Sequence, residues 1–334
     1  MLAGLGLTRP GRTAHHALAQ PGPTPTPALA TRAVFMPIYV SPDSFPIDIP
    51  VSPEASPAPI GPEATPGPID PTATPGAEES QCGAFDDSQD VELYNGNLGV
   101  PRAFVDELQP PVGNLRWNAN LPLLFDDPGT VNGVHWCSGT LIADDLFLTA
   151  GHCFSQTPSG WRVPRTNGAD SPISRAEIAS HMHVSFNYQF DSMGIARAEI
   201  PVSVVGLVED QLGGLDFAIV QLAENPGTPF GRARVAAADA PQGSTVCIIG
   251  HPRGLHKKIE AGLASQFQGP NVYYNDIDTD GGSSGAGILS SPAGVIVGIH
   301  TNGGCGTVAS GNNYGLRISS LLPVSPTLTG IAAT

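Results

Sequence analysis

The sequence predicts an all-β fold for residues 81–327. From about Cys82 onward, short runs of β-branched and apolar residues alternate with turns rich in Gly, Pro, Asn and Asp. Helical periodicity is weak almost throughout, and Ile173–Met182 is the best helix candidate. Many short strands separated by turns are typical of a barrel or a sandwich. The clearest strand candidates are Val112–Trp117, Gly139–Ala143, Leu146–Thr149, Phe217–Leu222, Thr245–Ile249 and Gly294–His300.

Residues 1–80 have a different composition. They contain 17 of the 34 prolines, together with repeated Thr, Ser, Ala and Gly. Proline without periodicity gives extended, solvated backbone that cannot bury a core. We therefore expect residues 1–80 to be a disordered leader, pro-segment or linker, with an O-glycosylated stalk as the alternative. The remaining residues, about 250, suffice for a sizeable hydrophobic core.

Charge and cysteine content restrict the partners and the compartment. The net charge is −15 and the only lysines are Lys257 and Lys258, so the chain repels phosphate backbones and anionic lipid. No run approaches the roughly 18 apolar residues of a membrane span. The five cysteines form no CxxC pair, which favours disulfides in an oxidising compartment over a metal site. We expect a secreted or extracytoplasmic monomer without cofactor, metal or nucleic acid, although residues 1–19 contain only a weak export signal.

A histidine lies in the second of two segments that each carry a cysteine. The segments are Cys137–Ile142 and Leu148–Cys153, and His152 directly precedes Cys153. A bridge between Cys137 and Cys153 would fasten the loop that carries His152 to a strand, with an entropic value of about 3 kcal/mol. A general base gains from such stiffness, because it must stay within hydrogen-bond reach of its nucleophile.

The glycine-rich segment Gly281–Gly287 offers two candidate nucleophiles. Acyl transfer needs an exposed hydroxyl and backbone N–H groups directed at the oxyanion, and glycines allow a turn tight enough to present both. Ser283 lies in a G-x-S-x-G pattern, the nucleophile elbow of α/β-hydrolases, which requires an acid and then a histidine downstream. No Asp or Glu follows Asp280, so this pattern is excluded and Ser284 remains.

Asp216 is the candidate for the acid that orients His152. It leads the apolar run Phe217–Leu222, and it follows His152 by 64 residues and precedes Ser284 by 68. A carboxylate at the entry to a buried strand can fix the tautomer of an imidazole and stabilise its charged form. The chain order His–Asp–Ser supports this assignment more than the local segment does.

Together these segments resemble the chymotrypsin superfamily of trypsin-like serine proteases from about Val112 to Ile318. The segments Thr245–Gly254, Asp278–Gly285 and Val297–Gly303 are similar to the bacterial glutamyl-endopeptidase branch. The resemblance implies two antiparallel six-stranded β-barrels with a peptide-hydrolysing site between them. His152 and Asp216 would lie on the first barrel and Ser284 on the second, with the N–H groups of Gly282 and Ser284 as the oxyanion hole. Ser283 replaces the aspartate with which trypsins bind their new N-terminus.

The same resemblance offers two alternative specificities for the residue before the scissile bond, P1. Asp278 lies where trypsins place the carboxylate that binds Lys or Arg. Thr279 and His300 match the positions where glutamyl endopeptidases hold a substrate carboxylate. The sequence favours an acidic P1 residue and leaves Lys or Arg as the alternative. Thr301 and Gly303 would offer backbone to an extended polypeptide substrate.

The resemblance also bears on the other cysteines and on other functions. Cys82 and Cys305 would form a second disulfide, as in lysyl-endopeptidase relatives, and Cys247 would be the odd thiol.

A protease-like binding module without catalysis is disfavoured, because the triad and both oxyanion positions are present. A quality-control protease with a peptide-binding PDZ domain is disfavoured too, because only about 50 residues follow Ser284.

Overall fold

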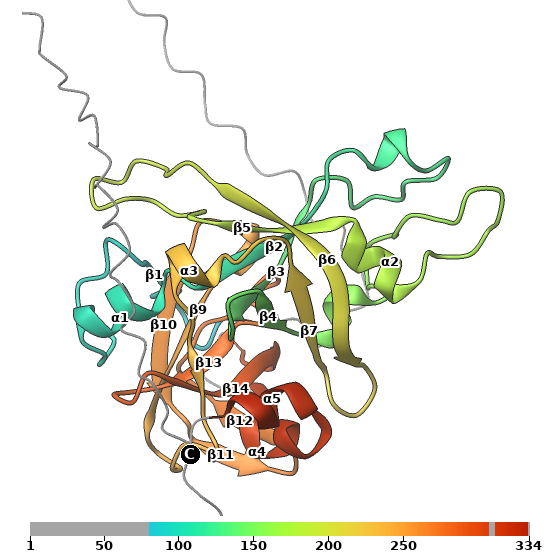
Figure 1. Ribbon diagram of the computed structural model, residues 1–334. Coiled ribbons are helices and arrows are strands. Elements are labelled where there is room, and N and C mark those ends of the chain that lie inside the picture. The colour runs from blue at the N-terminus through green and yellow to red at the C-terminus, as the bar shows by residue number, and fades with distance from the viewer. Residues whose placement is uncertain (1–79, 307–310, 333–334) are drawn as a thin grey trace, which may run out of the picture. The chain divides into compact units, whose positions relative to one another are not determined.

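The computed structural model describes residues 80–306 and 311–332, which belong to a compact unit spanning Pro68–Thr334. The expected Pro-rich leader, apart from Ser80, lies outside the described residues. Strands make up most of the described elements (Figure 1), and the predicted all-β class is confirmed. None of the described helices is long and apolar enough to cross a bilayer.

Six antiparallel strands close into a first barrel in the order β2-β3-β4-β7-β6-β5. Side chains alternate between the interior and the outside of such a barrel, and the interior here is filled by large apolar residues such as Trp117, Phe147 and Phe186. The strands are β2 (Val112–Trp117), β3 (His135–Leu141), β4 (Leu146–Thr149), β5 (Met182–Phe186), β6 (Ile200–Gln211) and β7 (Phe217–Leu222).

The second sheet has nine strands in an open path, β1-β10-β9-β13-β14-β15-β12-β11, with β8 paired in parallel to β14. The six longer strands of this path correspond to the expected second barrel. Strands β10 and β12 pair with the short β1 and β11 at their outer edges, so the hydrogen-bonded path does not close on itself. The strands are β1 (Gln89–Asp90), β8 (Arg234–Val235), β9 (Thr245–Gly250), β10 (Lys258–Leu263), β11 (Gln266–Gln268), β12 (Asn271–Tyr274), β13 (Gly287–Ser290), β14 (Val295–Asn302) and β15 (Asn313–Arg317).

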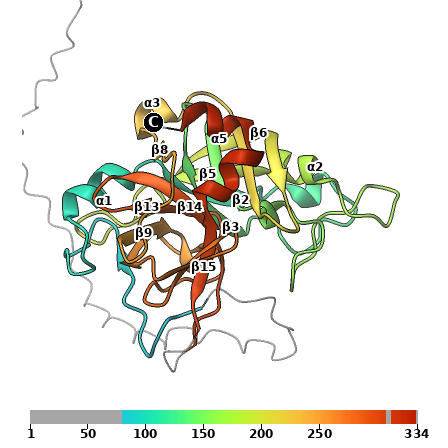
Figure 2. The same ribbon diagram turned by 90° about the horizontal axis from the view of Figure 1, so that it is seen from below.

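Short helices connect and flank the two sheets. Helix α2 lies within the predicted Ile173–Met182 and begins at a capping box formed by Ser174 and Glu177. The C-terminal helix α5 was not predicted; it lies beside β6 (Figure 2), where the Thr327 N–H donates to Glu209 at 2.9 Å. The helices are α1 (Arg102–Leu108), α2 (Arg175–Ser180), α3 (Gly227–Phe230), α4 (Ile318–Leu321) and α5 (Pro326–Ile331), with 3-10 turns η1 (Leu121–Leu123), η2 (Gly151–Phe154), η3 (Pro252–Gly254) and η4 (Leu322–Val324).

Two disulfides fasten loops to these sheets. Cys137 on β3 is joined to Cys153 in η2, and Cys82 is joined to Cys305 after β14. Cys247 is the free cysteine of the described residues and is buried in β9. Burial raises the pKa of its thiol, so Cys247 is a packing residue and not a reactive one.

Removing the Cys137–Cys153 bridge is expected to lower the free energy of unfolding by about 3 kcal/mol, because a bridge across 16 residues restricts the unfolded chain. Guanidinium denaturation of the Cys137→Ala/Cys153→Ala variant measures this loss. The Cys247→Ala variant is the control, since it removes a buried thiol but no bridge. Equal stabilities of the double variant and the unmodified protein would contradict the prediction.

Candidate active site

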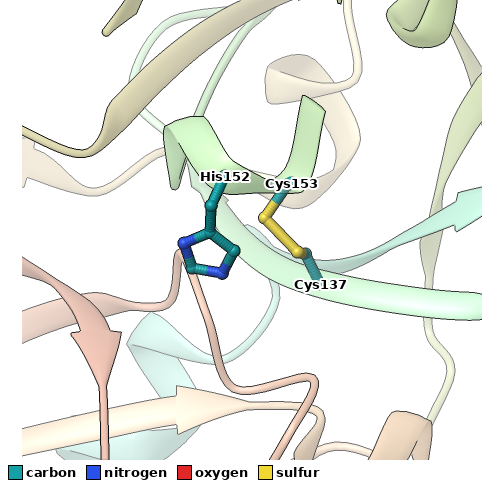
Figure 3. A group of neighbouring side chains, drawn as sticks. All are labelled: Cys137, His152 and Cys153. Atoms are coloured by element: carbon teal, nitrogen blue, oxygen red, sulfur yellow. A yellow bond between two sulfur atoms is a disulfide. The ribbon is translucent and has the colours of Figure 1, made fainter. Parts of the chain in front are cut away.

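His152 is held by a short turn that two features keep rigid. The turn η2 follows β4, and its Cys153 is joined to Cys137 beside the imidazole ring (Figure 3). Gly151 packs so closely on the end of β6 that a Cβ would lie 1.9 Å from the Gln211 carbonyl oxygen. Only glycine therefore fits before His152.

The structure brings His152, Asp216 and Ser284 together. Asp216 Oδ2 lies 2.6 Å from His152 Nδ1, and Asp216 Oδ1 accepts the His152 backbone N–H at 2.7 Å. On the other side of the ring, Nε2 lies 2.7 Å from Ser284 Oγ. A carboxylate that holds Nδ1 fixes the ring so that Nε2 can accept a proton from a hydroxyl. This arrangement can therefore activate Ser284 as a nucleophile.

Ser284 lies in a turn that glycine alone can form. Gly282 and Gly285 have φ values of +106° and +88°, a region that side chains with a Cβ rarely enter. A Cβ on Gly285 would also lie 2.2 Å from Thr149 Oγ1. The Gly281 carbonyl accepts the Arg253 N–H at 2.6 Å, and within the described residues the Gly282 N–H donates no hydrogen bond. That N–H is thus available to a ligand, as an oxyanion hole requires.

Ser138 supports this turn and was missed in the sequence. It is fully buried on β3. Its hydroxyl accepts the His251 N–H at 2.8 Å and donates to the Gly282 carbonyl at 2.7 Å, and its own N–H donates to the Ser284 carbonyl at 2.9 Å. The signal in the sequence was a polar residue inside an otherwise buried strand, next to a cysteine.

A cleft of about 690 Å³ surrounds His152 and Ser284. Its walls come from both sheets and include two tryptophans, Trp136 and Trp161, whose rings meet edge to face at 5.6 Å. Arg253 lies at its edge in an ion pair with Asp280. The sequence did not single out the tryptophans, which lie in unremarkable loop and strand segments.

Two predicted pocket residues lie away from this cleft. Asp278 does not line it; its carboxylate accepts the backbone N–H groups of Cys82 at 2.5 Å and of Asp87 at 3.2 Å. Thr279 is buried and lines the same second cavity as Asp278. The assignment of Asp278 to the cleft is therefore corrected, because the segment after Cys82 occupies its carboxylate.

The other predicted pocket residues lie on or after β14. Thr301 lines the cleft, and Gly303 is buried just beyond the strand. His300 is fully buried, and its Nδ1 is hydrogen-bonded to the Tyr274 hydroxyl. Its carbonyl accepts the Gly285 N–H at 2.8 Å, so His300 lies directly against the turn of Ser284.

Two comparisons with known proteins match parts of this sequence. Residues 137–299 match the model of the trypsin-like peptidase domain family. Secreted RxLR effector protein 73 of Plasmopara viticola is 29% identical over 258 residues, which are 72% of this chain and span 55% of that relative.

Solved structures that match this chain have low sequence identity and low TM-scores. A Glu endopeptidase in complex with MPD is 18% identical, with a TM-score of 0.42 over 72% of this chain and 96% of that one. A serine endoprotease from Yersinia pestis is 16% identical, with a TM-score of 0.44 over 67% and 65%. Over residues 137–299, this chain is therefore similar to the trypsin-like peptidase domain family.

Proposed function

We propose that the chain is a serine endopeptidase that acts through His152, Asp216 and Ser284. The observation that carries the proposal is the continuous hydrogen-bonded series from carboxylate to imidazole to hydroxyl, with 2.6 and 2.7 Å between successive atoms. Ser284 Oγ attacks the peptide carbonyl while His152 Nε2 takes its proton, and His152 then returns that proton to the leaving amine. Water next hydrolyses the acyl-enzyme by the same route. The N–H groups of Gly282 and Ser284 stabilise the oxyanion.

A serine-directed phosphonylating reagent tests this function. We expect one label per chain, on Ser284, located by peptide mapping. The Ser283→Ala variant is the matched control and keeps the label, whereas Ser284→Ala loses it. An unlabelled, folded protein would contradict the proposal and favour a protease-like binding module.

We infer further that the P1 residue is acidic. Among the described residues that line the cleft, Asp216 is the one carboxylate, and it is bonded to His152. Arg253, which is paired with Asp280, is the one arginine or lysine among the described residues that line the cleft. The carboxylate of Asp278, which would select Lys or Arg, is held by backbone N–H groups. Specificity arises from such charge differences between alternatives.

Cleavage of a mixed peptide library measures the P1 preference. We expect cleavage after Glu or Asp to exceed cleavage after Lys or Arg. The Arg253→Gln variant should reduce the preference for Glu over Gln. Preferred cleavage after Lys or Arg would overturn the acidic assignment without affecting the peptidase assignment.

We also propose that the protein is extracytoplasmic and monomeric. Residues 1–80 would serve as a leader, pro-segment or linker, and residues 81–327 would form the protease domain. Two disulfides support the location, because such bridges persist in oxidising compartments. The Plasmopara viticola relative is named as a secreted effector, which also supports this location.

The Ser138→Ala variant is expected to lower kcat by about tenfold to a hundredfold with little change in KM. This is a smaller loss than the fall in kcat of about 10²–10³ that follows the removal of an oxyanion donor itself. Ser138 acts indirectly, by holding the Gly282 carbonyl through its hydroxyl. Steady-state kinetics on a peptide substrate measure the effect. The Ser138→Thr variant keeps the hydroxyl and should restore part of kcat; an equal loss in both variants would assign Ser138 to packing alone.

A further inference from the structure

A second cavity, of about 40 Å³, lies behind the turn that carries Ser284. Four parts of the chain line it: the N-terminal segment with Gln81, Asp86 and Ser88, residues 248–255, strand β10 with Lys258 and Glu260, and the segment Asp278–Ser283. A volume of about 10–15 Å³ is enough for a single water. The cavity can therefore hold an ion together with its other ligands.

Buried oxygens without hydrogen-bond partners line this cavity. Glu260 is 4% exposed, and within the described residues neither of its carboxylate oxygens has a partner. Ser88 Oγ and Thr279 Oγ1 also lack partners there. A buried polar group left unsatisfied costs about 1–3 kcal/mol, and more if it is charged. Several such oxygens around one cavity indicate a site for a cation, which oxygen lone pairs can coordinate.

Three carboxylates meet at the same place. Oxygen atoms of Asp86, Glu260 and Asp278 all lie within 4.8 Å of one another. The nearby cationic side chains pair with other carboxylates: Lys258 Nζ lies 3.9 Å from Asp90, and Arg253 is bonded to Asp280.

We propose that Asp86, Glu260 and Asp278 bind a calcium ion in this cavity. Calcium takes six to eight oxygens at about 2.3–2.6 Å, and the three carboxylate oxygens lie within 4.8 Å of one another, close enough to share one such ion. Magnesium usually keeps several waters and is bound through one or two carboxylates, so a set of three protein carboxylates favours calcium. The hydroxyls of Ser88 and Thr279 are further oxygen donors at the cavity wall. The sequence analysis expected no metal. The three proposed ligands lie in segments far apart along the chain, so their proximity could not be read from the sequence.

The bound ion would join two parts of the domain that matter for the active site. Asp86 follows Cys82, which is bridged to Cys305. Asp278 leads directly into the turn that carries Ser284. The calcium ion thus fastens the N-terminal segment to the base of this turn. The proposal does not depend on the proposed peptidase activity, since binding is measured without substrate.

Titration of the full chain with calcium chloride tests the site. After treatment with a chelator, we expect isothermal titration calorimetry to show one calcium per chain with a Kd below about 1 mM. Calcium at a hundred times Kd should raise Tm by about 5 °C or more over a chelator. Magnesium at the same concentration should bind at least tenfold more weakly.

Variants locate the site. Glu260→Gln keeps the size of the side chain but removes its charge, and should weaken calcium binding at least tenfold. Asp86→Asn alters an exposed residue and gives the same result if the Glu260 variant fails to fold. Glu107→Gln, which removes one exposed charge on α1, is the matched control and should bind normally. No heat of binding and equal Tm in calcium and chelator would overturn the proposal, as would normal binding by both cluster variants.

Discussion

Replacing Ser284 with alanine is expected to lower kcat for peptide hydrolysis by about 10⁴-fold or more. Without the hydroxyl that lies 2.7 Å from His152 Nε2, no acyl-enzyme forms, and water must attack the substrate directly. Removing the nucleophile from such a triad costs about as much as removing all three members. The remaining catalysis comes from substrate binding and the oxyanion N–H groups.

The neighbouring serine provides the matched control for this experiment. Ser283 Oγ accepts the Asp280 N–H at 3.3 Å and lines the second cavity, away from His152. The Ser283→Ala variant is therefore expected to keep kcat within about tenfold of the unmodified protein. Steady-state rates with a cleavable peptide measure both variants. Activity of the Ser284 variant above one hundredth of the original would rule out Ser284 as the nucleophile.

Local chemistry in the sequence marks two of the three predicted triad residues. His152 adjoins a cysteine and follows a glycine that no other residue can replace. Ser284 lies between glycines with positive φ values. Asp216 begins an apolar strand, which is a common arrangement, so it was assigned mainly from its position between His152 and Ser284 in the chain. The signals of His152 and Ser284 lie mainly in short segments, so they can be read without the fold.

What could not be predicted depends on contacts between distant segments. The direction of Asp278 is set by the backbone of Cys82 and Asp87, almost 200 residues earlier. The two hydrogen bonds of the Ser138 hydroxyl cross from one sheet to loops of the other. Glu260 reads in the sequence as an ordinary strand residue, and only the fold places it beside Asp86. The open edge of the second sheet likewise follows from the pairing of the short β1 and β11.

Replacing Asp216 with asparagine is expected to lower kcat by about 10⁴-fold while KM changes little. Asparagine has nearly the same shape, and its carbonyl can still accept the His152 backbone N–H that Asp216 accepts at 2.7 Å. The amide nitrogen would then face His152 Nδ1, where Asp216 Oδ2 now lies at 2.6 Å. An amide can only donate there, so the ring proton moves to Nε2. His152 would then donate to Ser284 and could no longer take its proton.

A variant of a nearby carboxylate distinguishes the effect of the His152 tautomer from the effect of losing a negative charge. Asp210 at the end of β6 pairs with Arg175, whose guanidinium donates to the Gly151 carbonyl beside His152. The Asp210→Asn variant removes the same charge from the same region but leaves the contacts of the His152 ring in place. Steady-state kinetics should show less than a tenfold loss for Asp210→Asn and about 10⁴ for Asp216→Asn. Similar losses of kcat in the two variants would contradict this prediction. They would mean that the negative charge near His152, and not the tautomer of its ring, governs the rate.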